Sequence, residues 1–174
     1  MTNTDSSDEA ILVALGSNLP DGFLDCEALL EAAVGRLPGL AVQVLARSGW
    51  WRSQAWPDPA YPPFVNGVVR IATPLPPRSL LGALLGLEGS FGRIRGAPNA
   101  PRTLDLDLIA YGRAVLATPG LTLPHPSAFE RRFVTGPLAQ MLPDWRHPVN
   151  GRSAAELDAA AAVGRDAAPV AGAA

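Results

Sequence analysis

Two carboxylates alternate with leucines in the stretch Pro101-Arg102-Thr103-Leu104-Asp105-Leu106-Asp107-Leu108-Ile109. Because successive side chains of a strand point to opposite faces, the leucines should pack into a core while Asp105 and Asp107 share the other face. Two like charges on a rigid strand, roughly 6 to 7 Å apart at their Cα atoms, repel each other unless cations lie between them. Hard oxygen ligands of this kind suit Mg²⁺. The stretch therefore predicts a half-buried strand that carries a metal site.

Basic side chains flank this strand in the sequence. Guanidinium groups pair bidentately with phosphate oxygens, so arginines beside a metal site indicate a polyphosphate ligand. An Asp-x-Asp pair alone is more often the solvated face of an edge strand. The metal and polyphosphate interpretation is favoured because carboxylates with a purely structural role seldom collect phosphate donors as well. The donors are Arg93, Arg95 and Arg102 before the pair, and His125, Arg131 and Arg132 after it.

The composition is typical of one globular domain. The chain has 174 residues, of which 48% are hydrophobic and 17% charged, and is long enough to bury a sizeable core. A net charge of -2 argues against a general nucleic-acid binder, which carries a basic excess. All 14 basic residues are arginines, which excludes Schiff-base lysine chemistry and a Walker A phosphate loop. Anion binding must therefore be local.

Cysteine usage and the N-terminal sequence both favour the cytoplasm. Cys26 is the single cysteine, and its place on an apolar helical stripe predicts a buried, inert thiol. Because no disulfide forms within the chain, a reducing compartment is expected. Residues 1–10 lack the basic and apolar regions of a signal peptide, and no apolar run approaches the roughly 20 residues that cross a bilayer. We expect a cytoplasmic protein without a membrane partner.

Hydrophobic periodicity predicts an α+β domain. The expected order is strand, helix, strand, strand, helix, strand, which is the βαββαβ arrangement of a ferredoxin-like sheet with helices packed on it, and a C-terminal helical extension follows. Residues 1–10 should be a disordered lead, 11–163 a single domain and 164–174 a flexible tail. The expected strands are 11–15, 40–52, 64–72 and 103–111, and the expected helices are 23–37, 78–91, 129–142 and 154–163.

Several motifs occur in the order found in one enzyme family. From about Ile11 to Trp145 the chain resembles the 6-hydroxymethyl-7,8-dihydropterin pyrophosphokinases. The resemblance implies a ferredoxin-like α+β fold, two Mg²⁺ ions, and transfer of diphosphate from ATP to the pterin hydroxymethyl group with release of AMP, in tetrahydrofolate biosynthesis. The motifs are Ala14-Leu15-Gly16-Ser17-Asn18-Leu19, Phe64-Val65-Asn66, Glu88 with Gly92-Arg93-Ile94-Arg95, Pro101 to Asp107, Leu123-Pro124-His125-Pro126 and Arg131-Arg132-Phe133.

The resemblance also implies roles on the nucleotide side. Asp105 and Asp107 correspond to the ligands that bridge both metal ions. Arg93 and Arg95 correspond to a mobile, catalytic arginine loop that closes over the triphosphate. The implied nucleotide-binding residues are Glu88, Arg95, Arg102, His125 and Arg131, although an ordinary surface glutamate is nearly as good an interpretation of Glu88.

Pterin is flat, aromatic on its face and polar on its edge, so its pocket needs rings and amide-type hydrogen bonds. By resemblance, Phe64 and Phe133 are a stacking pair and Asn66 reads the polar edge. Each phenylalanine alone is more often a core residue, but Phe64 and Asn66 share one strand face. Backbone groups of the loop from Ser53 to Trp56 should complete the edge, and Gly16 should allow close approach.

The chain departs from the family pattern at three places, which are Pro98 to Ala100, Gln54 to Trp56, and Pro126. Two alternative functions use the same features. A two-metal phosphodiesterase or nuclease also needs paired aspartates, but it would need further carboxylate or histidine ligands. A ferredoxin-like RNA-binding module would stack bases on sheet aromatics, which the acidic balance argues against. We expect a monomer that binds ATP and a pterin, and no nucleic acid.

Overall fold

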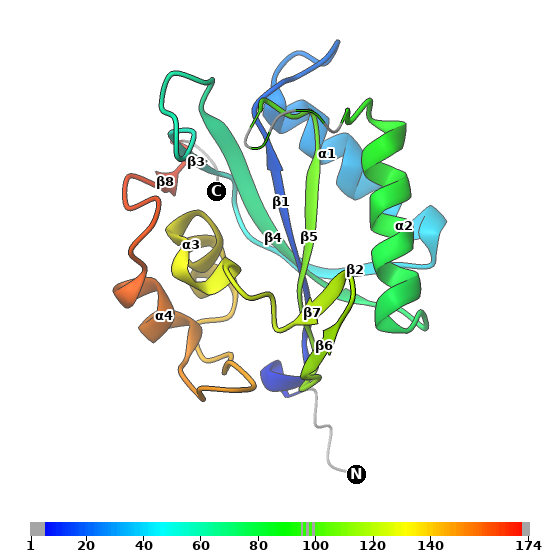
Figure 1. Ribbon diagram of the computed structural model, residues 1–174, viewed down its shortest axis with the longest axis vertical. Coiled ribbons are helices and arrows are strands. Elements are labelled where there is room, and N and C mark those ends of the chain that lie inside the picture. Colours follow the sequence, from blue (N-terminus) through cyan, green and yellow to red (C-terminus); the bar gives the residue numbers. More distant parts are fainter. Residues whose placement is uncertain (1–5, 95, 97, 99, 172–174) are drawn as a thin grey trace.

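The computed structural model describes residues 6–94, 96, 98 and 100–171. Its central sheet contains β1 Ile11–Ser17, β2 Gln43–Arg47, β3 Trp51–Ser53, β4 Phe64–Ala72, β5 Asp105–Tyr111 and β8 Ala168–Pro169. The strand order is β5-β1-β4-β3-β8, β2 also pairs with β4, and all these pairs are antiparallel (Figure 1). The predicted combination of helices with a sheet is confirmed.

Helices cover both faces of this sheet (Figure 1). On one face lie α1 Cys26–Arg36 and α2 Pro77–Ser90, and on the other lie α3 Arg132–Met141 and α4 Ala154–Ala160. Among the described helices, none is long and apolar enough to cross a membrane. The remaining elements are the hairpin of β6 Leu116–Thr118 and β7 Leu121–Leu123, and the short 3-10 helices Ser7–Glu9, Leu37–Leu40 and Ala128–Glu130.

The alternation of β5 divides its side chains between the two faces as predicted. Leu104, Leu106 and Leu108 are buried and pack with α1 and α2 in one core. Ile109 points the other way and packs in a second core with residues of α3 and α4. Burial of the leucines is the main force that holds β5 against the helices, because removal of apolar surface from water stabilises the fold.

The strand register brings candidate residues together on one face. Gly16 of β1 lies opposite Asp105 of β5 on one side and opposite Asn66 of β4 on the other. Directly opposed residues of antiparallel strands present their side chains to the same face. Since Gly16 has no side chain, no third side chain from β1 stands between the carboxylate and the amide.

Two predicted elements have different bounds in the structure. The strand expected over residues 40–52 is two strands, β2 and β3, with a break at Ser48 and Gly49. Ser48 N–H donates to Val68 O, and Ser48 Oγ accepts from Val68 N–H. Gly49 N–H points out of the sheet and donates to Gln140 Oε1. The helix expected from residue 23 begins at Cys26, because Asp25 Oδ1 accepts a hydrogen bond of 2.8 Å from Ala28 N–H and caps it.

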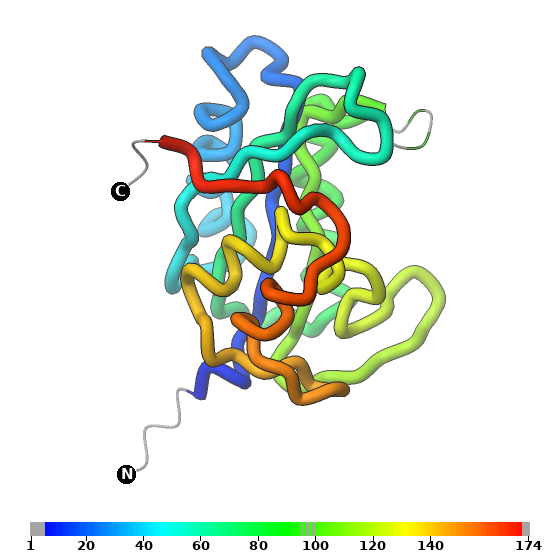
Figure 2. Tube along the Cα trace, turned by 90° about the vertical axis from the view of Figure 1, so that its left-hand side faces the viewer, coloured from blue at the N-terminus to red at the C-terminus, as the bar shows by residue number. Residues whose placement is uncertain are grey.

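Some described residues near both chain ends contact the domain, while residues 1–5 of the predicted lead and 172–174 of the predicted tail lie outside the described residues. At the N-terminal side, Ala10 is buried and Asp8 Oδ1 accepts a 3.0 Å hydrogen bond from Arg146 N–H. Within the segment for which a flexible tail is predicted, Ala168 and Pro169 form β8 and pair with β3, and this part of the chain runs beside β3 in Figure 2. Periodicity gave no signal for this segment because an extended edge segment that buries only Ala167 has no repeating apolar face.

Candidate active site

One cavity opens at the end of the sheet where β1, β4 and β5 meet the start of α3. It gathers most of the predicted site residues from both the nucleotide and the pterin sets. Glu88, Arg93 and His125 do not line it, and Arg95 lies outside the described residues. The predicted residues that line it are Gly16, Ser53, Trp56, Phe64, Asn66, Arg102, Asp105, Asp107, Arg131 and Phe133.

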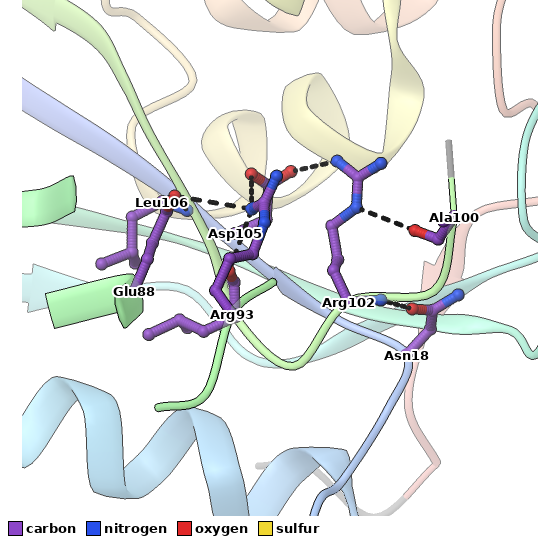
Figure 3. A network of polar contacts seen from close by, with 8 residues as sticks. Asn18, Glu88, Arg93, Ala100, Arg102, Asp105 and Leu106 are labelled. Carbon is purple, nitrogen blue, oxygen red and sulfur yellow. Dashed lines mark hydrogen bonds and ion pairs between the residues drawn. The ribbon is translucent and has the colours of Figure 1, made fainter. Parts of the chain in front are cut away.

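Asp105 is held by two arginines (Figure 3). Its Oδ1 accepts a hydrogen bond of 2.8 Å from Arg93 Nη1, and its Oδ2 accepts one of 3.1 Å from Arg102 Nη1. Both pairs are charge-assisted and largely shielded from solvent, which strengthens them relative to surface ion pairs. In this arrangement each carboxylate oxygen has a cationic partner.

Asp107 is in a different electrostatic position, because no hydrogen bond or ion pair joins it to any of the arginines that the structure describes. Burial, followed by the negative charges of Asp105 and Glu88, raises the pKa of Asp107 to about 7, and the charges of Arg131 and Arg102 only partly oppose this. A carboxylate in such a place favours the arrival of further positive charge.

The oxygen donors fit Mg²⁺ that is bound together with a nucleotide. Mg²⁺ sites of this type use one or two carboxylates and complete the coordination with substrate phosphates and water. The described part of the chain has no group of three or more His, Cys, Asp and Glu side chains that could hold a metal alone. The Asp105 and Asp107 pair is therefore suited to share a cation with phosphate oxygens.

Glu88 and Arg93 support β5 from outside the cavity. Glu88 is buried on α2, and its Oε1 accepts a 2.8 Å hydrogen bond from Leu106 N–H, which lies in the terminal strand of the sheet order. Arg93 donates 3.0 Å from its Nη1 to Leu104 O and lies 3.6 Å from Glu88 Oε1. In this conformation Glu88 bonds β5 to α2. Arg93 bonds both to Asp105 and to the backbone of Leu104 just before β5.

His125 lies in a neighbouring cavity together with Phe129 and His147. Its Nδ1 accepts hydrogen bonds from Ser127 N–H and Ala128 N–H, which assigns the remaining proton to Nε2. Burial and the positive charge of Arg131 lower the pKa of His125, although Asp105 opposes this. A neutral imidazole, whose Nε2–H has no hydrogen-bond acceptor among the described residues, thus lies near Arg131.

The predicted pterin residues form the other side of the cavity. Asn66 is buried, and its Nδ2 donates a 3.0 Å hydrogen bond to Ser53 Oγ. A Cβ atom at Gly16 would lie 3.3 Å from Asn66 Oδ1, so the glycine makes room for the amide, whereas the approach of a ligand to Gly16 stays a prediction. The Arg102 guanidinium lies 5.8 Å from the Phe64 ring centroid, which brings the two sides into contact.

A second such contact joins Arg131 to Trp56. The guanidinium carbon of Arg131 lies 5.8 Å from the centroid of the Trp56 ring. Phe133 enters the cavity two residues after Arg131, from the first turn of α3. Two arginine–aromatic contacts therefore form part of the cavity wall.

Asn18 is an important residue to which no role was given from the sequence. It is buried, exchanges backbone and side-chain hydrogen bonds with Arg102, and donates from Nδ2 to Pro62 O at 3.0 Å. These contacts tie the end of β1 to the segment before β5 and to the loop before β4. A polar residue directly after a buried strand was the available signal.

A cavity lined by paired carboxylates, arginines and aromatic rings is typical of enzymes that transfer a phosphoryl or diphosphoryl group to a flat small molecule. Comparison with known proteins identifies the family. The sequence model described as "7,8-dihydro-6-hydroxymethylpterin-pyrophosphokinase (HPPK)" matches residues 12–143. The chain belongs to this family of diphosphotransferases, which act in folate biosynthesis.

Curated relatives support this assignment. The chain is 43% identical over 147 residues to the 2-amino-4-hydroxy-6-hydroxymethyldihydropteridine pyrophosphokinase of a Synechocystis strain, covering 84% of this chain and 73% of the relative. It is 41% identical over 152 residues to the Pseudomonas aeruginosa protein of the same name, covering 87% of this chain and 91% of the relative.

Solved structures show the same fold in longer chains. The wild-type HPPK-DHPS crystal structure from Plasmodium falciparum superposes with a TM-score of 0.66 at 11% identity, covering 86% of this chain and 44% of that chain. The present chain thus spans less than half of the Plasmodium chain.

Proposed function

We propose that this chain transfers diphosphate from ATP to the hydroxymethyl group of 6-hydroxymethyl-7,8-dihydropterin and releases AMP. One observation carries the proposal: the carboxylates Asp105 and Asp107 line the same cavity as the aromatic residues Phe64 and Phe133. A polyphosphate bound at the carboxylates would lie next to a flat ring bound at the aromatics. Family membership supports the same reaction.

On the pterin side, the chain's residues would bind and orient. Phe64 and Phe133 offer aromatic faces for stacking, which adds roughly 0.5 to 1.5 kcal/mol beyond area burial. The Asn66 amide already donates to Ser53 Oγ, so its Oδ1 oxygen is left to accept from the ring edge. Backbone groups of Ser53 to Trp56 complete this edge in the proposal.

On the phosphate side, Asp105 and Asp107 would hold two Mg²⁺ ions. Such ions neutralise developing charge and align the attacking and leaving oxygens. Arg102 and Arg131 would donate to phosphate oxygens, and neutral His125 would donate from Nε2. Arg93 would leave Asp105 when the cations arrive, and with Arg95 would close over the triphosphate.

The reaction balances with no further reactant. The pterin hydroxymethyl oxygen attacks the β-phosphorus of ATP and loses its proton to solvent. The bond from the β-phosphorus to the oxygen that bridges the α- and β-phosphates breaks, and AMP leaves. Positioning and charge stabilisation are the protein's contributions, because phosphoryl transfer needs little covalent help.

Incubation of the chain with MgATP and the pterin, followed by separation of AMP from ADP, tests the proposal. AMP with a diphosphorylated pterin is expected, whereas ADP would indicate simple phosphorylation. A phosphodiesterase would instead hydrolyse a phosphodiester without pterin, but the described residues lack a third metal-binding side chain. Binding of single-stranded RNA would favour the RNA-binding alternative.

The ferredoxin-like assignment of the core is part of this proposal. It is supported by the antiparallel order β5-β1-β4-β3 and by helices α1 and α2 between strands along the chain. We also keep the expectation of a cytoplasmic monomer whose partners are its small-molecule substrates.

A further inference from the structure

Residues 162–170, here called the C-terminal strap, lie beyond residue 143, the last one that the family model matches. The beginning of the strap is bonded to the entry of α3. Ala162 N–H and Val163 N–H both donate to Glu130 O, at 3.1 and 3.0 Å, and Arg132 N–H donates to Val163 O at 2.8 Å. The strap is thereby fixed to the segment that carries Arg131 and Phe133 into the cavity.

The end of the strap is bonded to β3. Its residues Ala168 and Pro169 pair with Arg52 and Trp51, and Val170 N–H donates to Trp50 O at 2.9 Å. Figure 2 shows this course, with the red strap crossing from the helical part of the chain to the neighbourhood of β3. The strap therefore connects two segments that both contribute lining residues to the cavity.

One side chain of the strap reaches the predicted pterin loop. Asp166 Oδ2 accepts a hydrogen bond of 2.7 Å from Gln54 N–H. Gln54 lines the cavity between Ser53 and Trp56, directly after β3 ends. A charge-assisted bond to this N–H fixes the backbone where it leaves the sheet.

The strap also lies directly behind Phe133. Gly164 has a φ angle of 68°, and a Cβ atom built on it would lie only 2.5 Å from Phe133 Cδ1 and 3.0 Å from Cε1. Only glycine allows both this backbone conformation and this approach. The strap backbone is thus the surface on which the ring of Phe133 rests.

We propose that the C-terminal strap positions the pterin pocket. Asp166 is a positioning residue for the loop from Ser53 to Trp56, and the backbone at Gly164 supports the ring of Phe133. That the ligand is a pterin rests on the proposed function, whereas the positioning of the loop and of the Phe133 ring does not. Because Asp166 contacts Gln54 and Gly164 contacts Phe133, whereas Asp105 is bonded to Arg93 and Arg102, changes at Asp166 and Gly164 should affect pterin affinity more than ATP affinity.

Asp166→Ala and Asp166→Asn test the hydrogen bond. Loss of one charge-assisted bond should weaken pterin binding about three- to tenfold in Asp166→Ala, measured by pterin fluorescence, with KM for ATP unchanged. Asp166→Asn keeps an acceptor oxygen and should restore most of the affinity. The matched control is Asp144→Ala, which removes an exposed carboxylate from the turn after α3.

The double variant Gln54→Pro with Asp166→Ala tests whether Asp166 acts on pterin affinity through its hydrogen bond to Gln54 N–H. Proline has no N–H, so in the Gln54→Pro background the Asp166→Ala change should have no further effect on pterin affinity. Full additivity of the two changes would overturn the proposal. So would an Asp166→Ala protein with unchanged pterin affinity, or with equal loss of affinity for both substrates.

Gly164→Ala should weaken pterin binding more than Asp166→Ala, because the new methyl group displaces the Phe133 ring. If Gly164→Ala fails to fold, Asp166→Ala and Asp166→Asn still test whether the strap positions the pterin pocket.

Hydrogen exchange in the absence of substrate separates this proposal from the proposed function. Faster exchange at residues 54–56 in Asp166→Ala than in wild type is expected whatever ligand binds. Unchanged exchange would overturn the strap's role, while absence of AMP formation by the wild type would overturn only the proposed function.

Discussion

The two sides of the cavity are built in different ways. On the carboxylate side, Asp105 is held by ion pairs to Arg93 and Arg102. On the aromatic side, Asn66, Ser53 and Phe133 are held by neutral hydrogen bonds and by backbone packing. In the proposed function, phosphates and cations would replace the partners of these ion pairs, whereas the contacts of the aromatic side would remain. We infer that the carboxylate side governs turnover and the aromatic side governs pterin affinity.

The largest effect is expected from the carboxylates. Asp105→Asn and Asp107→Asn should each lower turnover about a hundredfold or more, because each removes charge that compensates bound Mg²⁺ without opening a cavity. AMP formation over a range of Mg²⁺ concentrations measures this, with thermal unfolding and Asp144→Asn as controls. Near-wild-type turnover at saturating Mg²⁺ would contradict the metal assignment.

The arginines should show the next largest effect. Arg93→Ala and Arg102→Ala should each lower turnover roughly tenfold to a hundredfold while pterin affinity changes little, since guanidinium groups meet the phosphates. The exposed Arg78 of α2, which bonds to Thr118, provides the control variant Arg78→Ala. If pterin affinity falls strongly and turnover at saturation is unchanged, these arginines belong to the pterin pocket and the prediction is wrong.

The aromatic residues should affect affinity more than turnover. Phe64→Ala and Phe133→Ala should each weaken pterin binding by roughly 0.5 to 1.5 kcal/mol beyond the loss of buried area, with nucleotide affinity nearly unchanged. Fluorescence titration measures the affinity, and Phe23→Ala is a matched control because Phe23 stacks on Phe91 away from the cavity. Equal losses for both substrates, together with lower thermal stability, would assign the rings to the core.

The smallest effect concerns pH and the neutral histidine. Burial and Arg131 lower the pKa of His125, so the unfolded chain takes up a proton near pH 6.5 before the folded chain does. Stability from this residue is complete above about pH 6.5 and is lost as pH falls toward the folded-state pKa. Denaturant unfolding at pH 7.5 and 6 should show a smaller decrease in His125→Gln. An unchanged decrease would mean that His125 is solvated in the folded chain.

Local patterns predicted the parts of the site that local geometry controls. Alternation along a strand predicted that Asp105 and Asp107 share one face and that the leucines share the other. The two-residue spacing of Phe64 and Asn66 likewise predicted that their side chains share a strand face. The contacts of Asn18 with Arg102, and of Gln54 with Asp166, join residues 84 and 112 positions apart. No repeating pattern encodes such pairs, because they depend on how separate elements meet. The pairing of β8 with β3 had no signal in the sequence for the same reason.

The alternation in β5 also limits where chain length can change among relatives. A one-residue insertion inside the strand would turn the carboxylates toward α1 and α2 and the leucines toward the cavity, so it would destroy the core and the site together. An insertion in the loop between α2 and β5 turns no strand side chain over. Insertions and deletions should therefore accumulate in that loop and be absent from Asp105 to Tyr111.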